Sequence, residues 1–528
     1  MYNKKLYRTF SLFLISIFFL TVSQSHAQDN LKSGIAAVKS GDYVSAVVLL
    51  KKAVNADPKS YDANLYYGIS LYKTGSLIDA EKYLKNAIAV DEEKADAYTI
   101  LGEVYSEQKK YDAAAESFDN AKKYLPLNKT ADVLDPDEIA QIVNTLSDEA
   151  DNFIASGKVD KAIASLTQAR TYDKNNPLIY VGLGDAYLVR GAYDPATTNY
   201  KQSLTLNPNF APAYYGLGMV AFRQKKYNDA VQDFSKAIDV DKNFAEAYFE
   251  KGLLLYLSEE WNAALDAFKK YAELKPGSTK GNTYYAKTLY AMGRLDEAMT
   301  LLDEVLKSDL ASSEANKYKA YIYFEKKDYQ NALAYFDKVK PEDYNSEDWT
   351  KRGGVLNALK DFPNAYDSFK KAIEMDSTYA DAYFEYGKSQ FNDEKYQDAL
   401  INFDKAISLG TTNLAAYVYK GICYYYLKDY AKAIEQFQKS IEVNDKFASS
   451  YLWLGNSYVA SLPQYTTNKD TYTKVNGEAI TAYKKVLELE PDNQDAKDQV
   501  IAAYKRVLEL DPSNQDAKDQ IIKLGGKL

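Results

Sequence analysis

The sequence contains almost no histidine or cysteine: His26 and Cys423 are the only examples among 528 residues. Histidine is the commonest general base in enzymes, and protein zinc sites are usually built from several histidine and cysteine ligands. A single cysteine also has no partner for an internal disulfide. The shortage excludes a Cys/His zinc site and an internal disulfide, and it counts against hydrolytic or transfer catalysis. We predict no enzyme activity, no metal and no cofactor.

The sequence also lacks an apolar run long enough to cross a membrane. The apolar stretch at residues 10–22 has 13 residues, whereas a membrane-spanning helix needs about 20. Three basic residues precede it and Ser25-His26-Ala27 follows it, which is the small-x-small pattern of a signal-peptide cleavage site. We therefore predict that residues 1–27 are a cleavable signal peptide, that the mature chain is periplasmic or secreted, and that it has no stable membrane insertion. A retained anchor is the alternative, which the short run disfavours.

Basic residues are fewer than acidic ones. There are 65 lysines and arginines against 74 aspartates and glutamates, a formal net charge of −9. Removing residues 1–27 takes away three positive charges and no negative ones, which leaves a net charge of −12. Nucleic-acid binding depends on lysine and arginine that neutralise phosphates. We therefore predict that nucleic acid is not a partner.

The chain does contain a repeat of 34 residues. A small residue marks each of thirteen units, and an alanine follows it twelve residues later in every unit but the last, where an insertion delays it to Ala479. Two amphipathic helical patterns in each unit indicate a solenoid of helix-turn-helix repeats. A side chain larger than that of alanine would force apart two helices that cross at these points. The clearest pairs of small residues are Gly34 and Ala46, Gly68 and Ala80, Gly102 and Ala114, Gly184 and Ala196, Gly218 and Ala230, Gly252 and Ala264, Gly387 and Ala399, and Gly421 and Ala433.

Unit twelve shows the full pattern, with Gly421 at position 8, Tyr424 at 11, Tyr430 at 17, Ala433 at 20 and Phe437 at 24. With these residues the sequence resembles the tetratricopeptide repeat (TPR) family over about residues 28–493. The resemblance implies an all-α, right-handed superhelical solenoid of about thirteen repeats with C-terminal capping helices. It also implies a non-enzymatic scaffold that binds proteins or extended peptides in a concave groove. With the predicted export, this indicates a role in envelope assembly or secretion.

Irregularities in the repeat give the expected organisation of the chain. Asp135-Pro136 reads as a helix N-cap with an early proline, so we expect a lengthened first helix in unit four. Residues 480–500 recur as residues 501–521 with 16 of 21 positions identical, which predicts capping helices over about 494–510 and from about 515. The expected segments are units one to three at 28–128, an insertion at 129–142, units four to twelve with the first helix of unit thirteen at 143–460, an exposed loop at 461–475, the second helix of unit thirteen at 476–493, and the capping region at 494–528.

Tyrosine is abundant, with 49 copies, and aromatic residues recur at positions 5, 9 and 12, which line the groove in the family that the chain resembles. In units three and four, the groove residues are instead polar or acidic, with Glu103, Glu107 and Asp151. Cys423 lies among small and aromatic residues, so we expect it to pack rather than react. The predicted groove aromatics from unit six to unit twelve are Tyr215, Phe222, Phe249, Tyr256, Tyr290, Tyr321, Phe324, Phe384, Phe391 and Tyr425.

Two interpretations of the aromatic residues remain open. Aromatic stripes at helical spacing usually belong to cores, so these rings could only support neighbouring helices. Alternatively, they form a platform for an extended peptide or a sugar chain, because exposed aromatic clusters favour recognition. The second reading gives the alternative function, a glycan or cell-wall binding module.

Overall fold

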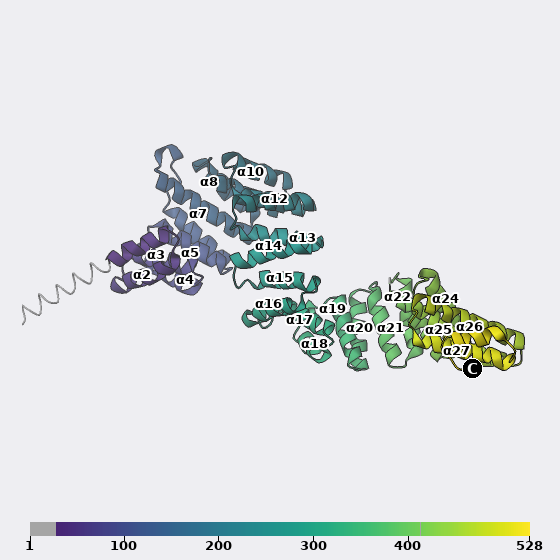
Figure 1. The fold of residues 1–528 in the computed structure, drawn as a ribbon. Helices are drawn as coiled ribbons and strands as arrows, with labels where there is room; N and C mark the ends of the chain where they lie inside the picture. Colours follow the sequence, from purple (N-terminus) through teal and green to yellow (C-terminus); the bar gives the residue numbers. More distant parts are fainter. Residues whose placement is uncertain (1–27, 412) are drawn as a thin grey trace, which may run out of the picture. The chain divides into compact units, whose positions relative to one another are not determined.

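The computed structural model describes residues 28–411 and 413–528, so the predicted signal peptide lies outside the described residues. The described residues are helical, with no strand among them (Figure 1). This confirms the prediction of an all-α helical solenoid. Within the same part of the chain, no helix has both the length and the apolar character needed to span a membrane.

The chain divides into two compact units, one up to Leu274 and one from Lys275. In the first unit, a helix over residues 28–39 packs on the helix that follows it, because a Cβ atom added to Gly34 would lie 2.5 Å from Leu50 Cγ. The first unit then contains α2 (Tyr43–Ala56), α3 (Tyr61–Lys73), α4 (Leu77–Val90), α5 (Ala95–Glu107), α6 (Tyr111–Lys123), α7 (Pro136–Ala155), α8 (Val159–Tyr172), α9 (Pro177–Val189), α10 (Tyr193–Leu206), α11 (Ala211–Arg223), α12 (Tyr227–Val240), α13 (Ala245–Leu257) and α14 (Trp261–Leu274).

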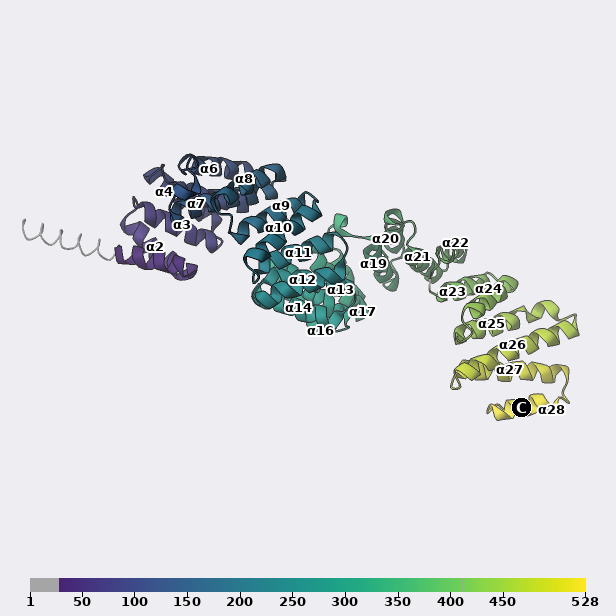
Figure 2. The same cartoon turned by 90° about the horizontal axis from the view of Figure 1, so that it is seen from above.

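The second unit continues the succession of antiparallel hairpins. At its end, α25 to α28 lie side by side, each packed on the next (Figure 2). The unit contains α15 (Thr279–Ala291), α16 (Leu295–Ser308), α17 (Ser313–Glu325), α18 (Tyr329–Phe336), α19 (Ser346–Ala358), α20 (Phe362–Met375), α21 (Ala380–Asn392), α22 (Tyr396–Ser408), α23 (Ala415–Tyr426), α24 (Tyr430–Val443), α25 (Ala448–Ser461), α26 (Lys469–Leu489), α27 (Gln494–Leu510) and α28 (Gln515–Lys523).

The odd-numbered helices form the inner layer of each unit. Successive odd-numbered helices from α3 to α11, and from α15 to α25, contact one another as well as their own hairpin partners. Successive even-numbered helices make at most sparse contacts in the described part of the chain. In a curved stack, the layer whose members lie closer together is the concave one. The side chains that the odd-numbered helices direct away from their partners therefore form the inner face.

The recurring glycine lets the two helices of a hairpin pack closely. A Cβ atom added to Gly102 would lie 2.7 Å from the ring atom Cε1 of Phe118, sixteen residues later. The same contact joins Gly218 to Phe234 at 2.6 Å. The alanine of the pattern, such as Ala114, is fully buried. Large side chains of the second helix thus fill the space that the missing Cβ atoms leave, and close packing of this kind stabilises the hairpin.

The turn inside each hairpin uses a left-handed residue. Glycine occupies this position at five turns, for example Gly191 with φ 80°. Seven other turns have lysine or glutamate there, for example Lys225 with φ 61°. A residue with a Cβ atom is strained in this conformation. The packing of the two helices therefore imposes the left-handed conformation at this position, whether or not the residue is glycine.

The sequence anticipated the lengthened helix of unit four. Within the predicted insertion at 129–142, α7 begins at Pro136 and runs for 20 residues. Asp135 accepts a hydrogen bond of 2.8 Å from the Glu138 backbone N–H, and its own N–H donates one of 3.0 Å to Glu138 Oε2. This reciprocal capping fixes the start of the helix.

The predicted exposed loop at 461–475 is wrong. A short 3₁₀ turn covers Leu462–Tyr465, and α26 begins at Lys469 rather than at 476. Asn468 caps this helix by accepting a hydrogen bond of 3.0 Å from the Thr471 N–H. The additional residues therefore lengthen the second helix of unit thirteen. After it, α27 and α28 occupy the residues at which capping helices were expected.

Candidate functional site

The inner face of the first unit contains a cavity of about 540 Å³ between α3, α5 and α7. Apolar side chains from α3 and α5 form part of its lining, namely Leu65, Tyr66, Ile69 and Ile100. These side chains sit at helical spacing on the faces that α3 and α5 turn away from their hairpin partners. The cavity thus offers apolar surface at the bottom of a concave layer.

Acidic side chains surround this apolar surface. Asp96, Glu103, Asp137 and Asp148 line the cavity, and Lys73 is the one basic residue among its lining residues. The Lys73 ammonium lies 3.6 Å from Glu103 Oε2. One lysine therefore faces four carboxyl groups, and the cavity carries an excess of negative charge.

Hydrogen bonds between α5 and α7 hold the walls in place. Gln141 Nε2 donates a hydrogen bond of 2.7 Å to Asp96 Oδ1. The buried hydroxyls of Thr99 and Thr145 are 2.9 Å apart, and Ser106 donates a hydrogen bond of 2.6 Å to the buried Asn152 Oδ1. A polar seam of this kind fixes the register of the two helices, because a shift would leave buried polar groups without partners.

The carboxyl groups continue along the inner face beyond the cavity. Burial, together with the charges of Glu103 and Asp151, raises the pKa of Asp148 to about 8. Desolvation and the charge of Glu103 raise the pKa of Asp151 to about 6. Burial also raises the pKa of Asp185 to about 6, and Asp151 adds to that effect. These mutual effects define one acidic row, Glu103, Asp148, Asp151 and Asp185, across α5, α7 and α9.

Sequence reasoning found half of this row. Glu103 and Asp151 were expected on the inner face, and the structure brings them together with Asp148 and Asp185, which were missed. Asp185 occupies the same repeat position as Glu103 and Asp151, one residue after the small residue of the unit, so the repeat itself carried the signal. Asp148 lies outside the repeat positions counted as groove-lining, and the lengthened α7 hid its neighbourhood. The other predicted acidic residue, Glu107, is exposed at the end of α5.

The arrangement suits the binding of a cationic side chain rather than of a metal. Among the described residues, no three histidine, cysteine, aspartate or glutamate side chains are placed to ligate a metal ion. A lysine or arginine side chain needs only carboxylate oxygens within hydrogen-bond reach. The acidic row offers them beside apolar surface.

The predicted groove aromatics of the first unit contact their own hairpins and neighbours. Phe249 is only 3% exposed and packs against Phe268, with a ring-centroid distance of 5.7 Å. Tyr215, Phe222 and Tyr256 are half-buried. Each of the three lies near a further ring, of which Trp261 beside Tyr256 is the largest, with centroids 5.3 Å apart.

In the second unit, the predicted aromatics divide in the same way. Tyr321 and Phe384 are buried, at 7% and 4% exposure. The Tyr321 hydroxyl donates a hydrogen bond to Asp348, which also accepts one of 3.1 Å from Lys317 Nζ. Phe391 is half-buried and packs against Tyr419 with centroids 5.2 Å apart. The other half-buried members are Tyr290, Phe324 and Tyr425.

Burial therefore corrects part of the aromatic prediction. Phe249, Tyr321 and Phe384 occupy the core between hairpins, where a ligand would have to displace their packing partners. They come from positions 5 and 9, which face the neighbouring hairpin closely. Ligand contact by the seven half-buried rings stays a prediction.

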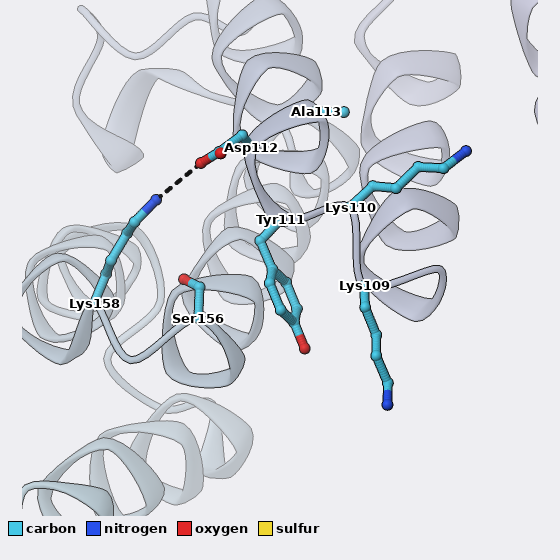
Figure 3. Close-up of a pocket in the computed structure, with 7 residues that line it drawn as sticks. All are labelled: Lys109, Lys110, Tyr111, Asp112, Ala113, Ser156 and Lys158. Carbon is cyan, nitrogen blue, oxygen red and sulfur yellow. Dashed lines mark hydrogen bonds and ion pairs between the residues drawn. The ribbon is translucent and has the colours of Figure 1, made fainter.

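Two other recesses lie near the turns of the first unit. One, of about 460 Å³, is lined by Lys109, Lys110 and Lys158 among others. Figure 3 shows that Lys158 points to Asp112, at 3.2 Å, whereas Lys109 and Lys110 extend away from this pair. These lysines do not converge on one point. The other recess, of about 580 Å³, has a mainly apolar lining that includes Tyr227, Val231 and Leu254.

Comparison with known proteins supports the repeat assignment. Two family models described as "Tetratricopeptide repeat" match residues 211–244 and 415–447, and residues 31–77, 79–126 and 286–346, respectively. A third, described as "TPR repeat", matches residues 184–225. No curated protein sequence matches this chain.

Several solved structures are similar to parts of the chain. A chain of the APC/C hetero-tetramer Cut9–Hcn1 has 13% identity and a TM-score of 0.42, with 89% of this chain and 95% of that chain covered. The C-terminal part of a TPR repeat-containing protein from Cytophaga hutchinsonii has 25% identity and a TM-score of 0.35, with 45% and 99% covered. YrrB, described as a TPR protein with an unusual peptide-binding site, has 22% identity and a TM-score of 0.31, with 39% and 97% covered.

Proposed function

The chain is a tetratricopeptide repeat protein, and on that premise we propose that it is a non-enzymatic scaffold that binds other proteins through its inner face. The observation that carries the proposal is the cavity between α3, α5 and α7. It combines apolar surface with fixed polar groups on the concave side of a stack of helices, and repeat proteins use such concave surfaces for binding.

The chemistry of the chain supports a binding role over a catalytic one. Cys423 is buried, and burial raises the pKa of its thiol to about 12, whereas a nucleophilic cysteine needs a lowered pKa. The one histidine of the sequence lies within the proposed signal peptide. No histidine, the commonest general base, lies among the described residues.

Residues 1–27 support export of the mature protein. Their basic start, short apolar run and small-x-small end are the pattern of a secretory signal. We propose that the mature scaffold works in the periplasm or outside the cell, in envelope assembly or secretion. Detection of a mature N-terminus at Gln28 in an envelope fraction tests this step.

A second candidate function is binding of a glycan or cell-wall polymer. The observation that favours it is the set of half-buried rings on the inner face of the second unit, with Phe391 and Tyr425 as members. Sugar rings pack well on aromatic faces that keep one side open to solvent. Retention of the purified protein on isolated cell-wall polysaccharide, lost when Phe391 and Tyr425 are replaced by alanine, tests it.

The scaffold function is tested by photo-crosslinking in the native cell. A photoreactive amino acid replaces Asn144 or Leu178, which are exposed on inner-layer helices, or Gln202, which is exposed on the outer helix α10. The proposal expects protein adducts from the two inner positions and few from Gln202. Equal adducts from all three positions would show that the inner face is not the binding surface.

A further inference from the structure

A line of exposed apolar side chains runs beside the acidic row on α9. Leu178 is 59% exposed and Val189 is 56% exposed, although both are large apolar residues. Residues three, four and seven apart lie on the same side of a helix, so both share a face with Val181 and Asp185. The inner face of α9 therefore presents apolar and acidic groups side by side.

The acidic row next to this apolar line is short of partners. Asp148 and Asp151 form no ion pair or hydrogen bond with any described residue, and Lys73, whose charge acts on Asp148, is already paired with Glu103. Asp185 is fixed in position because the Tyr200 hydroxyl donates a hydrogen bond of 2.6 Å to its Oδ1. The carboxyl groups are thus held close together at a cost in free energy that Lys73, the one basic residue lining the cavity, offsets only in part.

The inner face of the second unit has the opposite arrangement. There, Lys287 pairs with Glu314 at 3.2 Å, Lys351 with Glu347 at 3.0 Å, and Lys388 with Glu385 at 2.8 Å. Acidic side chains on an inner face of this protein are therefore not unpaired as a rule. The excess of carboxyl groups is a property of the cavity and of α7 and α9.

We propose that the cavity between α3, α5 and α7, together with the adjoining face of α9, binds a protein segment in which lysine or arginine alternates with apolar residues. Charge complementarity selects the cations, which reach Asp148 and Asp151. The apolar side chains cover Ile69 and Ile100 in the cavity and Leu178 and Val189 beside it. Because the carboxyl and apolar groups lie side by side on this face, the segment has to offer both kinds of side chain close together in its sequence.

This inference rests on the proposed scaffold function and names the class of partner at its first-unit site. The test uses the mature protein and a fluorescent peptide of about a dozen alternating lysine and leucine residues, with a glutamate–leucine peptide of the same length for comparison. Binding is followed by fluorescence anisotropy. We expect the cationic peptide to bind at least about tenfold more tightly than the anionic one.

Two double variants distinguish binding at the proposed site from a general attraction of the cationic peptide to an acidic protein. Asp148→Asn with Asp151→Asn removes two ionisable carboxyl groups from the row, and Asp229→Asn with Asp239→Asn removes two from the outer helix α12. We expect the first to weaken binding at least about tenfold and the second less than about twofold. Leu178→Ser with Val189→Ser, which keeps every charge, should weaken binding by several-fold.

Three results would overturn the inference: equal binding of the two peptides, equal losses in the two charge variants, or no loss when Leu178 and Val189 become serine. Circular dichroism of each variant shows whether the helices are intact. If neither peptide binds but cellular proteins still crosslink at Asn144 and Leu178, the partner class is wrong and the scaffold function stands. If crosslinking also fails at both inner positions, the scaffold function is wrong as well.

Discussion

Tyr200 donates a hydrogen bond of 2.6 Å to Asp185, and the Tyr200 ring lies in a narrow space between two glycines, Gly184 and Gly216. A Cβ atom added to Gly184 would lie 2.5 Å from the Tyr200 ring, and one added to Gly216 would lie 2.2 Å from it. The ring is therefore enclosed on both sides and cannot move to relieve a clash. The packing of the Tyr200 ring between the two glycines therefore determines where its hydroxyl holds the Asp185 carboxyl group on the inner face.

We expect Gly216→Ala to destabilise the first unit. Overpacking costs about 1–3 kcal/mol, and the gain of about 1 kcal/mol from replacing a helical glycine offsets only part of it. Gly477 in α26 is the matched control, since a Cβ atom there meets nothing within 4 Å. Urea unfolding should show a lower midpoint for Gly216→Ala and a higher one for Gly477→Ala. Stabilisation by both changes would contradict the close packing of the Tyr200 ring between the two glycines.

Replacing the left-handed lysine of a hairpin turn by glycine should stabilise the protein. Lys225 has φ 61°, and the equivalent residue of the preceding hairpin is Gly191 with φ 80°. Relief of the left-handed strain in Lys225→Gly is worth about 1 kcal/mol. The reverse change, Gly191→Lys, should cost a similar amount. Thermal unfolding measures both, and the same sign of effect for the two variants would refute the explanation.

The acidic row should make stability depend on pH. The pKa of Asp148 is about 8 in the folded protein and about 3.9 in an unfolded chain. Between these values the folded state holds a proton that the unfolded state has released, so stability falls as pH rises from about 4 to about 8. Asp148→Asn should weaken this fall and raise the melting temperature at pH 8 by about 2 °C.

The control for this prediction is Asp239→Asn. Asp239 lies on the exposed side of α12, and its hydrogen bond with Lys242 lowers its pKa. Its replacement should leave the fall in stability between about pH 4 and pH 8 unchanged. If Asp148→Asn leaves the same profile as the wild type, the carboxyl groups do not repel one another as the structure indicates.

Phe384 should behave as a core residue although its repeat position suggested the groove. It is 4% exposed and packs near Phe403 and Tyr419, with ring centroids 6.0 Å and 6.1 Å away. Phe384→Ala should cost about 3–5 kcal/mol. Ile401 on the outer helix α22 is 68% exposed, and Ile401→Ala should change stability by less than about 0.5 kcal/mol. A small change in stability for Phe384→Ala would contradict its assignment to the core and make this ring a candidate ligand contact again.

The repeat made the fold predictable because one packing rule acts at every copy. The glycine of each unit meets a large side chain of its own hairpin, as Gly102 meets Phe118, so a local spacing determines the architecture. The rule fails where residues are inserted. The polar run before Gly477 looks like a loop, but capping by Asn468 and the bond from Asn476 to the Ala503 carbonyl make it helical.

The site was less predictable because burial depends on neighbours that the repeat does not specify. Phe249 and Phe222 are both aromatic residues at groove-lining positions, yet the first is buried and the second half-buried. Asp185 was readable from its repeat position beside Asp151. Asp148 was not, because its place in the row depends on how the lengthened α7 lies against α5.

The most direct test of the scaffold account is photo-crosslinking in the native cell from Asn144 and Leu178 on the inner face, compared with Gln202 on the outer helix α10. The account predicts discrete protein adducts from the two inner positions and few from Gln202. Adducts of equal yield from Gln202, or none from the inner positions while the protein is folded, would contradict it.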